Sequence, residues 1–415
     1  RTLSRIIAPL YLMAVKHLDT LLHLVRGGPR SLRPKGELTI LAIGPFYSEN
    51  WVAAQLHALG RTPEFAEVTV ITPEEYGPLP GVRYEVPSQR IRRFTGMSIA
   101  RALTALSLAI RQKPDVIIGY HAPWNGMVGL LLGRLVKART AYFSVGGPAE
   151  IVGGGLYSEH ALFRRLGAES PRLENRFLEL INRFDSVLTM GSGSARWFRA
   201  RGVTKPVWPM GASVDGESFG SEPAATSDMT KRWDLVSVAR LAPIKRLDLL
   251  IETVALLKQD FPRIQAVIVG DGADRDRLER TRRDKLVENQ VTLAGFQSDV
   301  VSYLRASRIF VMTSASEGLP LALIEAMLCG LPVVAPAIGD IEDLVRHGEN
   351  GYLFSPGDVA GCSDWIRNLL ASSDLEAMGQ AARAGARAYT VEGRVNLWSS
   401  WVNTLTEPRP DLLGS

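Results

Sequence analysis

The sequence contains very little cysteine. Cys329 and Cys362 are the only two, and neither has another potential ligand at metal-binding spacing. This scarcity excludes a disulfide framework and a cysteine metal cluster. It indicates two reduced thiols in a cytosolic protein.

Long apolar runs are scarce as well. In the N-terminal segment, residues 1–37, charged residues interrupt every apolar run well short of the ~20 residues that a membrane-spanning helix requires. We expect an amphipathic helix beyond Pro9 that lies on an anionic membrane surface, because a basic helix with a basic tail, Arg26 to Lys35, attracts lipid headgroups. Two other interpretations remain: a helix packed on the first domain, and a secretion signal, which lacks a clear cleavage site here.

Excess charge of one sign is confined to that same segment. Residues 1–37 hold seven Lys and Arg and two acidic residues, which accounts for the whole net charge of +5. The rest of the chain is neutral overall, whereas a nucleic-acid groove needs many basic side chains spread along it. No nucleic-acid partner is expected.

The chain is long, and apolar strand-like runs alternate regularly with helical stretches along it. Its 415 residues exceed one ordinary core and suit two domains of about 200 residues. Short apolar runs alternate with helical stretches from Leu38 to Met190 and again from Trp233 to Phe354, which predicts two doubly wound parallel α/β sheets. The expected strands are Leu38–Gly44, Glu67–Thr72, Asp115–Gly119, Thr140–Gly146, Ser186–Met190, Leu235–Ala239, Ile264–Val269, 291–296, Ile309–Met312 and Pro332–Ala335.

The stretch from Ser314 to Pro336 best explains the rest of the chain. It predicts one helix between two buried strands, with Pro320 in the first turn and Gly330 at a left-handed C-terminal cap. The helix N-terminus opens at the carboxyl end of a strand, where Gly318 permits close approach, so it predicts an anion site.

Two carboxylates accompany this anion site. Glu317 precedes the helix and Glu325 lies about a turn inside it. Two acidic side chains beside a phosphate site would repel the phosphate unless they bind something else, and neutral hydroxyls can donate hydrogen bonds to them. A nucleotide-sugar offers both a diphosphate and hydroxyls. The alternative is a buried strand–helix–strand unit with an incidental pair of glutamates.

These residues carry a family resemblance. The run SEGLPLALIEAMLCGLPVVA, with its two glutamates, resembles the signature of glycosyltransferase family 4, the retaining transferases of GT-B fold. The resemblance covers residues 184–405 well and 38–183 loosely. It implies two Rossmann-like doubly wound domains facing a central cleft. The implied divisions are a basic segment 1–37, an acceptor domain 38–214, a linker 215–233, a nucleotide-sugar donor domain 234–390, and a helix 391–415 that returns to the first domain.

The loops of the second domain supply further candidates for the donor site. Arg240 and Lys245 follow its first strand, where two cations can meet a diphosphate, and they match the family's Arg-to-Lys segment. The resemblance places Glu317 on the transferred sugar and Glu325 on the ribose. It also implies nucleotide contacts from a set of loop residues: Gly318, Leu319, Pro320, Leu321, Gly270, Gly272 and Phe296.

The first-domain loops are expected to bind the acceptor, and they resemble the family only in part. His121 is the only histidine in the loops 44–51, 119–126 and 144–155, and we expect it to contact a reacting hydroxyl or the donor sugar. A structural role is the alternative for a lone loop histidine. The family's frequent Gly-Gly pair after the first strand is replaced by 45–48, PFYS, and its frequent strand-end histidine by Ser144 or Val145.

Together these residues predict a metal-independent transfer from a nucleotide-diphosphate sugar, UDP- or GDP-linked, to a hydroxyl, and the family resemblance implies that the transfer retains the anomeric configuration. The basic helix suggests a lipid-linked acceptor in bacterial surface polysaccharide or glycolipid assembly, on the cytoplasmic face of the inner membrane. Alternatives are a nucleotide-sugar epimerase or glycan phosphorylase of the same fold and a non-catalytic nucleotide-sugar sensor. A hydrolase is disfavoured because one helix and its lead-in loop carry both acids.

Overall fold

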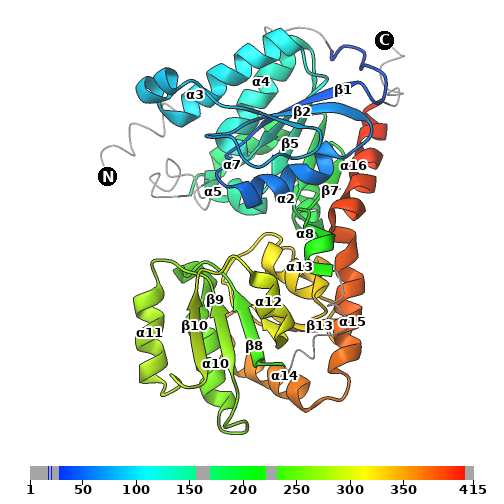
Figure 1. Ribbon diagram of the computed structural model, residues 1–415. Coiled ribbons are helices and arrows are strands. Elements are labelled where there is room, and N and C mark those ends of the chain that lie inside the picture. The colour runs from blue at the N-terminus through cyan, green and yellow to red at the C-terminus, as the bar shows by residue number, and fades with distance from the viewer. Residues whose placement is uncertain (1–16, 18–19, 21–27, 156–168, 221–230, 407–415) are drawn as a thin grey trace. The chain divides into compact units, whose positions relative to one another are not determined.

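Two parallel β-sheets, each with its own helices, organise the chain (Figure 1). The structure is a computed structural model that describes residues 28–155, 169–220 and 231–406, together with residues 17 and 20. Unit 1 comprises Arg1–Ser213 and Arg394–Ser415, and unit 2 comprises Val214–Gly393.

The sheet of unit 1 has seven parallel strands in the order β3-β2-β1-β4-β5-β6-β7. Their bounds are β1 Leu38–Ile43, β2 Phe65–Ile71, β3 Val82–Glu85, β4 Val116–Tyr120, β5 Arg139–Ser144, β6 Ser186–Thr189 and β7 Val207–Pro209. The five strands expected in this half are present, and β3 and β7 are additions. The chain reverses its strand order between β1 and β4, which makes this the switch point of the sheet.

The helices of unit 1 connect these strands in the right order for a doubly wound sheet. They are α2 Glu49–Gly60, α3 Gln89–Gln112, the π-helical turn η1 Ala122–Gly126, α4 Met127–Val136, the 3₁₀ turn η2 Gly147–Glu150, α5 Val152–Gly155, α7 Pro171–Ile181 and α8 Ser192–Ala200. Helix α3 packs on the sheet through Ala105 and Leu108, which join a buried cluster with Leu41 and Ile117. Burial of this kind is the main stabilising term.

The sheet of unit 2 has six parallel strands in the order β10-β9-β8-β11-β12-β13. Their bounds are β8 Trp233–Val238, β9 Ala266–Val269, β10 Val291–Gly295, β11 Ser307–Val311, β12 Val333–Pro336 and β13 Gly351–Phe354. Its helices are α9 Gly216–Gly220, η3 Pro243–Lys245, α10 Leu247–Leu257, α11 Arg275–Asp284, α12 Val300–Arg305, α13 Leu321–Leu328, η4 Ile341–Asp343, α14 Val359–Ala371, α15 Leu375–Ala386 and η5 Arg387–Tyr389. The last helix, α16 Val391–Thr406, belongs to unit 1 from Arg394 onward.

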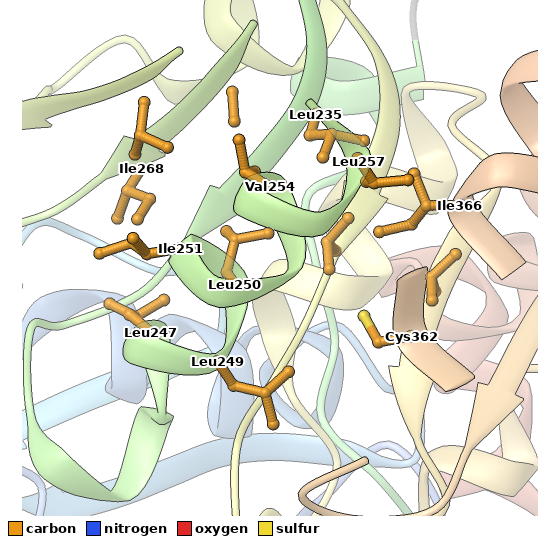
Figure 2. Packing of buried hydrophobic residues seen from close by; sticks show 14 of the residues in the cluster. Leu235, Leu247, Leu249, Leu250, Ile251, Val254, Leu257, Ile268, Cys362 and Ile366 are labelled. Atoms are coloured by element: carbon orange, nitrogen blue, oxygen red, sulfur yellow. The ribbon is translucent and has the colours of Figure 1, made fainter. Parts of the chain in front are cut away.

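Helix α10 shows how the core of unit 2 is built. Its apolar side chains, among them Leu250 and Val254, face Ile268 of β9 and Ile366 of α14 (Figure 2). Cys362 lies in the same cluster, and both cysteines of the chain are free and buried. The expectation of two doubly wound, Rossmann-like parallel-sheet domains is confirmed. The central cleft expected between them stays a prediction.

The segments expected outside the two domains are described only in part. The helix predicted within residues 1–37 lies largely outside the described residues, as does the centre of the predicted linker 215–233. Two described pieces of that linker are structured, α9 and the first residue of β8. Among the described residues, no helix has the length and apolar character to span a membrane.

The basic tail that we expected to contact lipid has another role in the structure. Arg30 and Arg33 pair with Asp115, with Nη2–Oδ1 and Nη1–Oδ2 distances of 3.3 and 2.8 Å. The Asp115 side chain has no exposed surface and therefore needs cationic partners. Lys35 donates a 2.7 Å hydrogen bond to Asn403. These three cations hold residues 28–37 on unit 1, and the expectation that the basic segment lies on an anionic membrane surface stays a prediction.

Candidate active site

The loops after β8 and β11 meet at the switch point of unit 2. In this sheet β8 is the first strand in the sequence and lies between β9 and β11. The connections after β8 and β11 leave the carboxyl edge toward opposite sides, which opens a crevice where ligands of doubly wound sheets bind. The sequence therefore brings two distant loops to one place.

Lys245 and Glu317 form an ion pair across this switch point. Lys245 ends the η3 turn after β8, Glu317 lies in the loop after β11, and the Nζ–Oε1 distance is 2.5 Å. Their side chains are 22% and 11% exposed, so the pair is largely shielded from water. Shielding strengthens the attraction between the two charges.

Hydrogen bonds to backbone carbonyls hold the two loops together around that pair. The Thr313 hydroxyl donates to the Lys245 carbonyl at 3.0 Å, and the Ala315 N–H donates to the Ile244 carbonyl at 2.8 Å. Thr313 is buried. The positions of the lysine and the glutamate are consequently set by the backbone as well as by their own charges.

Helix α13 begins beside Glu317 without a side-chain cap. Pro320 occupies the N-cap position with an extended backbone, and Leu321 is the first helical residue. The expected place of Pro320 in the first turn is therefore wrong by one position. Because proline has no side-chain acceptor for a cap, the first N–H groups of α13 stay available to an anion. Gly330 has the expected left-handed conformation, with φ of +77°.

The loop after β12 supports the other side of Glu317, which the sequence analysis missed. The Asp340 N–H donates to the Gly318 carbonyl at 3.1 Å. A Cβ atom on Gly339 would lie 2.0 Å from the Glu317 carbonyl oxygen, and Gly339 has a φ of +57°. Only glycine fits this close approach. The adjacent Gly-Asp pair was visible in the sequence, but its contact with Glu317 was not.

Glu325 lies in an unusual environment for a carboxyl group. Burial raises the pKa of its carboxyl to about 7. Its side chain makes no hydrogen bond or ion pair with any described residue. A carboxyl held in this way changes its protonation near neutral pH and can accept hydrogen bonds from ligand hydroxyls when ionised.

Gly270 and Gly272 are needed for packing between loops. A Cβ on either residue would lie 2.0 or 2.3 Å from the carbonyl oxygen of Ala239 or Leu241, respectively. The Gly270 N–H also donates to the Gly295 carbonyl at 2.9 Å. These contacts explain both glycines without a nucleotide, while they bring the loops after β8, β9 and β10 together.

Arg240 and Phe296 are exposed at this edge. Arg240 makes no hydrogen bond or ion pair with the described residues, and Phe296 is 78% exposed. An exposed cation and an exposed aromatic ring beside a ligand crevice are suited to a phosphate and a base.

His121 belongs to unit 1 and has a carboxylate partner that the sequence analysis missed. Its Nδ1 lies 2.8 Å from Oε1 of Glu150, in the η2 turn after β5. Glu150 is buried and also accepts hydrogen bonds from the Gly146 N–H at 2.6 Å and the Tyr142 hydroxyl at 2.7 Å. Burial acts to raise the pKa of Glu150, but His121 and these hydrogen bonds outweigh it and lower that pKa.

The backbone at His121 is strained. Its φ is +67°, a conformation that a residue with a Cβ adopts at a cost of about 1–3 kcal/mol. The π-helical turn η1 follows directly, and the Gly126 N–H closes it by donating to the His121 carbonyl at 2.9 Å. Strain and π-helical turns are both common at functional sites.

Comparisons with known proteins find similarity to glycosyltransferases. Residues 221–385 match the family model described as Glycosyl transferases group 1. N-acetyl-alpha-D-glucosaminyl L-malate synthase of Bacillus anthracis is 29% identical over 150 residues, which cover 36% of this chain and 39% of that protein. The lipopolysaccharide core biosynthesis glycosyltransferase LpsE of Rhizobium meliloti is 33% identical over 141 residues, covering 34% of this chain and 40% of that protein.

The solved structure of HepE from Anabaena, in complex with UDP, superposes with a TM-score of 0.67 at 20% identity and covers 89% of this chain and 99% of that one. The chain has the GT-B fold. The matches to both curated relatives span less than half of each relative's length.

The structure distributes the expected site residues over both units of the GT-B fold. It joins Lys245 to Glu317 and places the α13 N-terminus beside them, all within unit 2. His121 is joined to Glu150 in unit 1 instead. No group of three or more metal-ligating side chains occurs among the described residues.

Proposed function

We propose that the protein is a retaining glycosyltransferase of family 4 that transfers a sugar from a nucleotide-diphosphate sugar to a hydroxyl. The observation that carries this proposal is the Lys245–Glu317 pair at the switch point, beside the uncapped start of α13. It provides a cation, free backbone N–H groups and a carboxylate in one place. The match to group 1 glycosyl transferases over residues 221–385 supports the same assignment.

Each of these groups has a role in the proposed reaction. The bond between the anomeric carbon and the diphosphate oxygen breaks, the acceptor oxygen bonds to that carbon, and the proton of the acceptor hydroxyl passes to the departing diphosphate. Negative charge then builds on the departing diphosphate. Lys245 and the first N–H groups of α13 stabilise it, with Arg240 as an additional cation. The fixed cations make the transfer independent of a metal ion in this proposal.

Donor binding also changes the partner of Glu317. In the free protein its charge is balanced by Lys245 at 2.5 Å. A diphosphate competes for that lysine, which leaves the glutamate to accept hydrogen bonds from hydroxyls of the transferred sugar. Glu325 accepts from the ribose in the same proposal, and Phe296 with Gly270 and Gly272 borders the nucleotide. The donor is a UDP- or GDP-hexose, and UDP is the first choice because HepE has been solved with it.

The proposed acceptor is lipid-linked, in assembly of a bacterial surface polysaccharide or glycolipid at the cytoplasmic face of the inner membrane. The relation to LpsE, named for lipopolysaccharide core biosynthesis, supports this. Helix α3 supports a membrane surface independently. Between Gln89 and Gln112 this helix, which is kinked at Gly96, has five arginines, of which only Arg101 is buried, and no acidic residue. Its exposed apolar side chains are Ile91, Phe94, Ile99, Leu103 and Ile110, with Phe94 86% exposed.

An amphipathic basic helix of this kind binds anionic bilayers through both its apolar and its charged side chains. Sedimentation with vesicles of phosphatidylglycerol compared with phosphatidylcholine tests this part. We expect binding to phosphatidylglycerol only, weakened in Phe94→Ser and retained by a chain lacking residues 1–27. Equal binding of Phe94→Ser and wild type would refute a role for α3.

The catalytic proposal is tested by a panel of UDP-, GDP- and ADP-sugars with and without bacterial membrane extract. Release of the nucleoside diphosphate is measured for wild type, Glu317→Ala and the control Glu288→Ala, whose side chain is exposed on unit 2. We expect release from one donor, enhanced by extract and lost only in Glu317→Ala. Conversion of the donor sugar without release would instead identify an epimerase. Binding without any turnover would identify a sensor.

A further inference from the structure

Arg101 of α3 is a buried cation without an anionic partner. Its exposed fraction is 4%, and it forms no ion pair with any described residue. Its Nη1 donates a long, 3.4 Å hydrogen bond to the side-chain oxygen of Asn125, a neutral group. Its Nε is buried and has no hydrogen-bond partner in the part of the chain that the structure describes. Arginines this deeply buried are normally paired with carboxylates.

The position of Arg101 connects it with the strained loop at the switch point of unit 1. Asn125 is 7% exposed and belongs to the π-helical turn η1, which begins directly after His121. The turn is pressed against β4, because a Cβ on Gly119 would lie 2.9 Å from the Asn125 carbonyl oxygen. Arg101 therefore faces the edge where ligands of this sheet bind.

We propose that Arg101 binds an oxyanion, a phosphate or a carboxylate, carried by the acceptor substrate. A guanidinium has five N–H donors in a planar fork that matches either group, and Arg101 has only one of them in a described hydrogen bond. The missing counter-charge is then supplied by the ligand. Asn125 orients the guanidinium, and η1 couples this position to the His121–Glu150 pair.

The statement that the oxyanion belongs to an acceptor substrate rests on the proposed function. The binding of an oxyanion by Arg101 does not depend on it. The donor diphosphate has its own cations, Lys245 and Arg240, in unit 2. Saturating the protein with UDP therefore leaves Arg101 as the site under test. This separation allows the two proposals to fail independently.

The first experiment follows the Nε–H resonance of Arg101 by NMR in UDP-saturated protein labelled with ¹⁵N-arginine. The resonance is assigned by its loss in Arg101→Met. Inorganic phosphate and succinate are titrated separately as probes of the two oxyanion classes. We expect one of them to shift this resonance saturably and to raise the melting temperature. No shift with either probe would overturn the proposal, whereas a failure to bind UDP would count against the donor site only.

Stability separates a binding role from a structural one. Methionine matches the aliphatic stem of arginine and removes the charge. If Arg101 is an uncompensated binding charge, Arg101→Met keeps or raises the melting temperature while the effective oxyanion binds at least about tenfold more weakly. Arg111→Met, on the exposed end of the same helix, should change neither property. A lowered melting temperature with unchanged oxyanion binding would show that Arg101 is structural and overturn the proposal.

Discussion

Replacing Glu325 by Gln is expected to stabilise unit 2 at neutral and alkaline pH but not at acid pH. Burial raises the pKa of the Glu325 carboxyl from its ordinary value of 4.5 to about 7. Glutamine has nearly the same shape and no charge. The variant therefore removes the cost of an ionised group in α13 and leaves the packing in place.

The magnitude follows from the difference between the two pKa values. That difference is about 2.5, and each pKa unit corresponds to about 1.36 kcal/mol, so the full effect is about 3.4 kcal/mol. From pH 4.5 to about 7 the folded chain keeps a proton on Glu325 that the unfolded chain has lost. The free energy of unfolding of the wild type consequently falls as the pH rises through this range, and the loss is constant above it.

Urea unfolding of both proteins between about pH 5 and about pH 8, followed by tryptophan fluorescence, measures the effect. The stability advantage of Glu325→Gln should grow with pH and level off above about pH 7. Glu342→Gln, at an exposed position of η4, is the matched control. A stability difference that does not change with pH would refute the reasoning, as would an equal change in the control.

The same carboxyl links donor binding to protons. If Glu325 accepts hydrogen bonds from ribose hydroxyls, UDP binds the ionised form and releases a proton near pH 7. Calorimetry in two buffers of different ionisation enthalpy should detect this release in the wild type and not in Glu325→Gln. Equal proton release in both proteins would show that another group is responsible.

Three further variants test the supports of the site. Gly339→Ala should lower the free energy of unfolding by about 1–3 kcal/mol, because its Cβ would lie 2.0 Å from the Glu317 carbonyl oxygen. The control is Gly348→Ala, at a position that also has a positive φ but open space around it. Equal losses of stability in urea titrations of the two variants would contradict the clash. Lys245→Met should reduce nucleoside diphosphate release at least about tenfold while the melting temperature changes by only a few degrees, and full activity would remove this lysine from the mechanism. Glu150→Gln should lower the free energy of unfolding by about 1–3 kcal/mol at neutral pH, because it removes the charge that pairs with His121. Since the pKa of Glu150 is lowered in the folded chain, this loss should shrink as the pH falls below 4.5. A loss that does not depend on pH in urea titrations would contradict the ion pair.

The sequence was sufficient to predict those helices and strands that bury a continuous apolar run. Strands such as β4 and β11 are buried over nearly their whole length, and α13 lies between proline and glycine signals at its two ends. Strand β3 was missed because its side chains are mostly half-exposed, so it has no apolar run. Strand β7 has only three residues and ends in Pro209.

The sequence was also sufficient to expect Lys245 and Glu317 near one another, because the loops after parallel strands lie at one edge of the sheet. Their functional roles and that of Glu325 stay predictions. The pairing of residues was decided only by the tertiary structure. Glu317 was expected to face hydroxyls and faces Lys245 in the free protein, 72 positions away. No local sequence pattern indicated the roles of Glu150 and Arg101. Whether a carboxylate lies beside a histidine, or an arginine is buried without a carboxylate, depends on which distant segments pack together and exclude water. Burial and proximity between distant parts of the sequence are properties of the packed chain, and within each unit they set the charges of these residues.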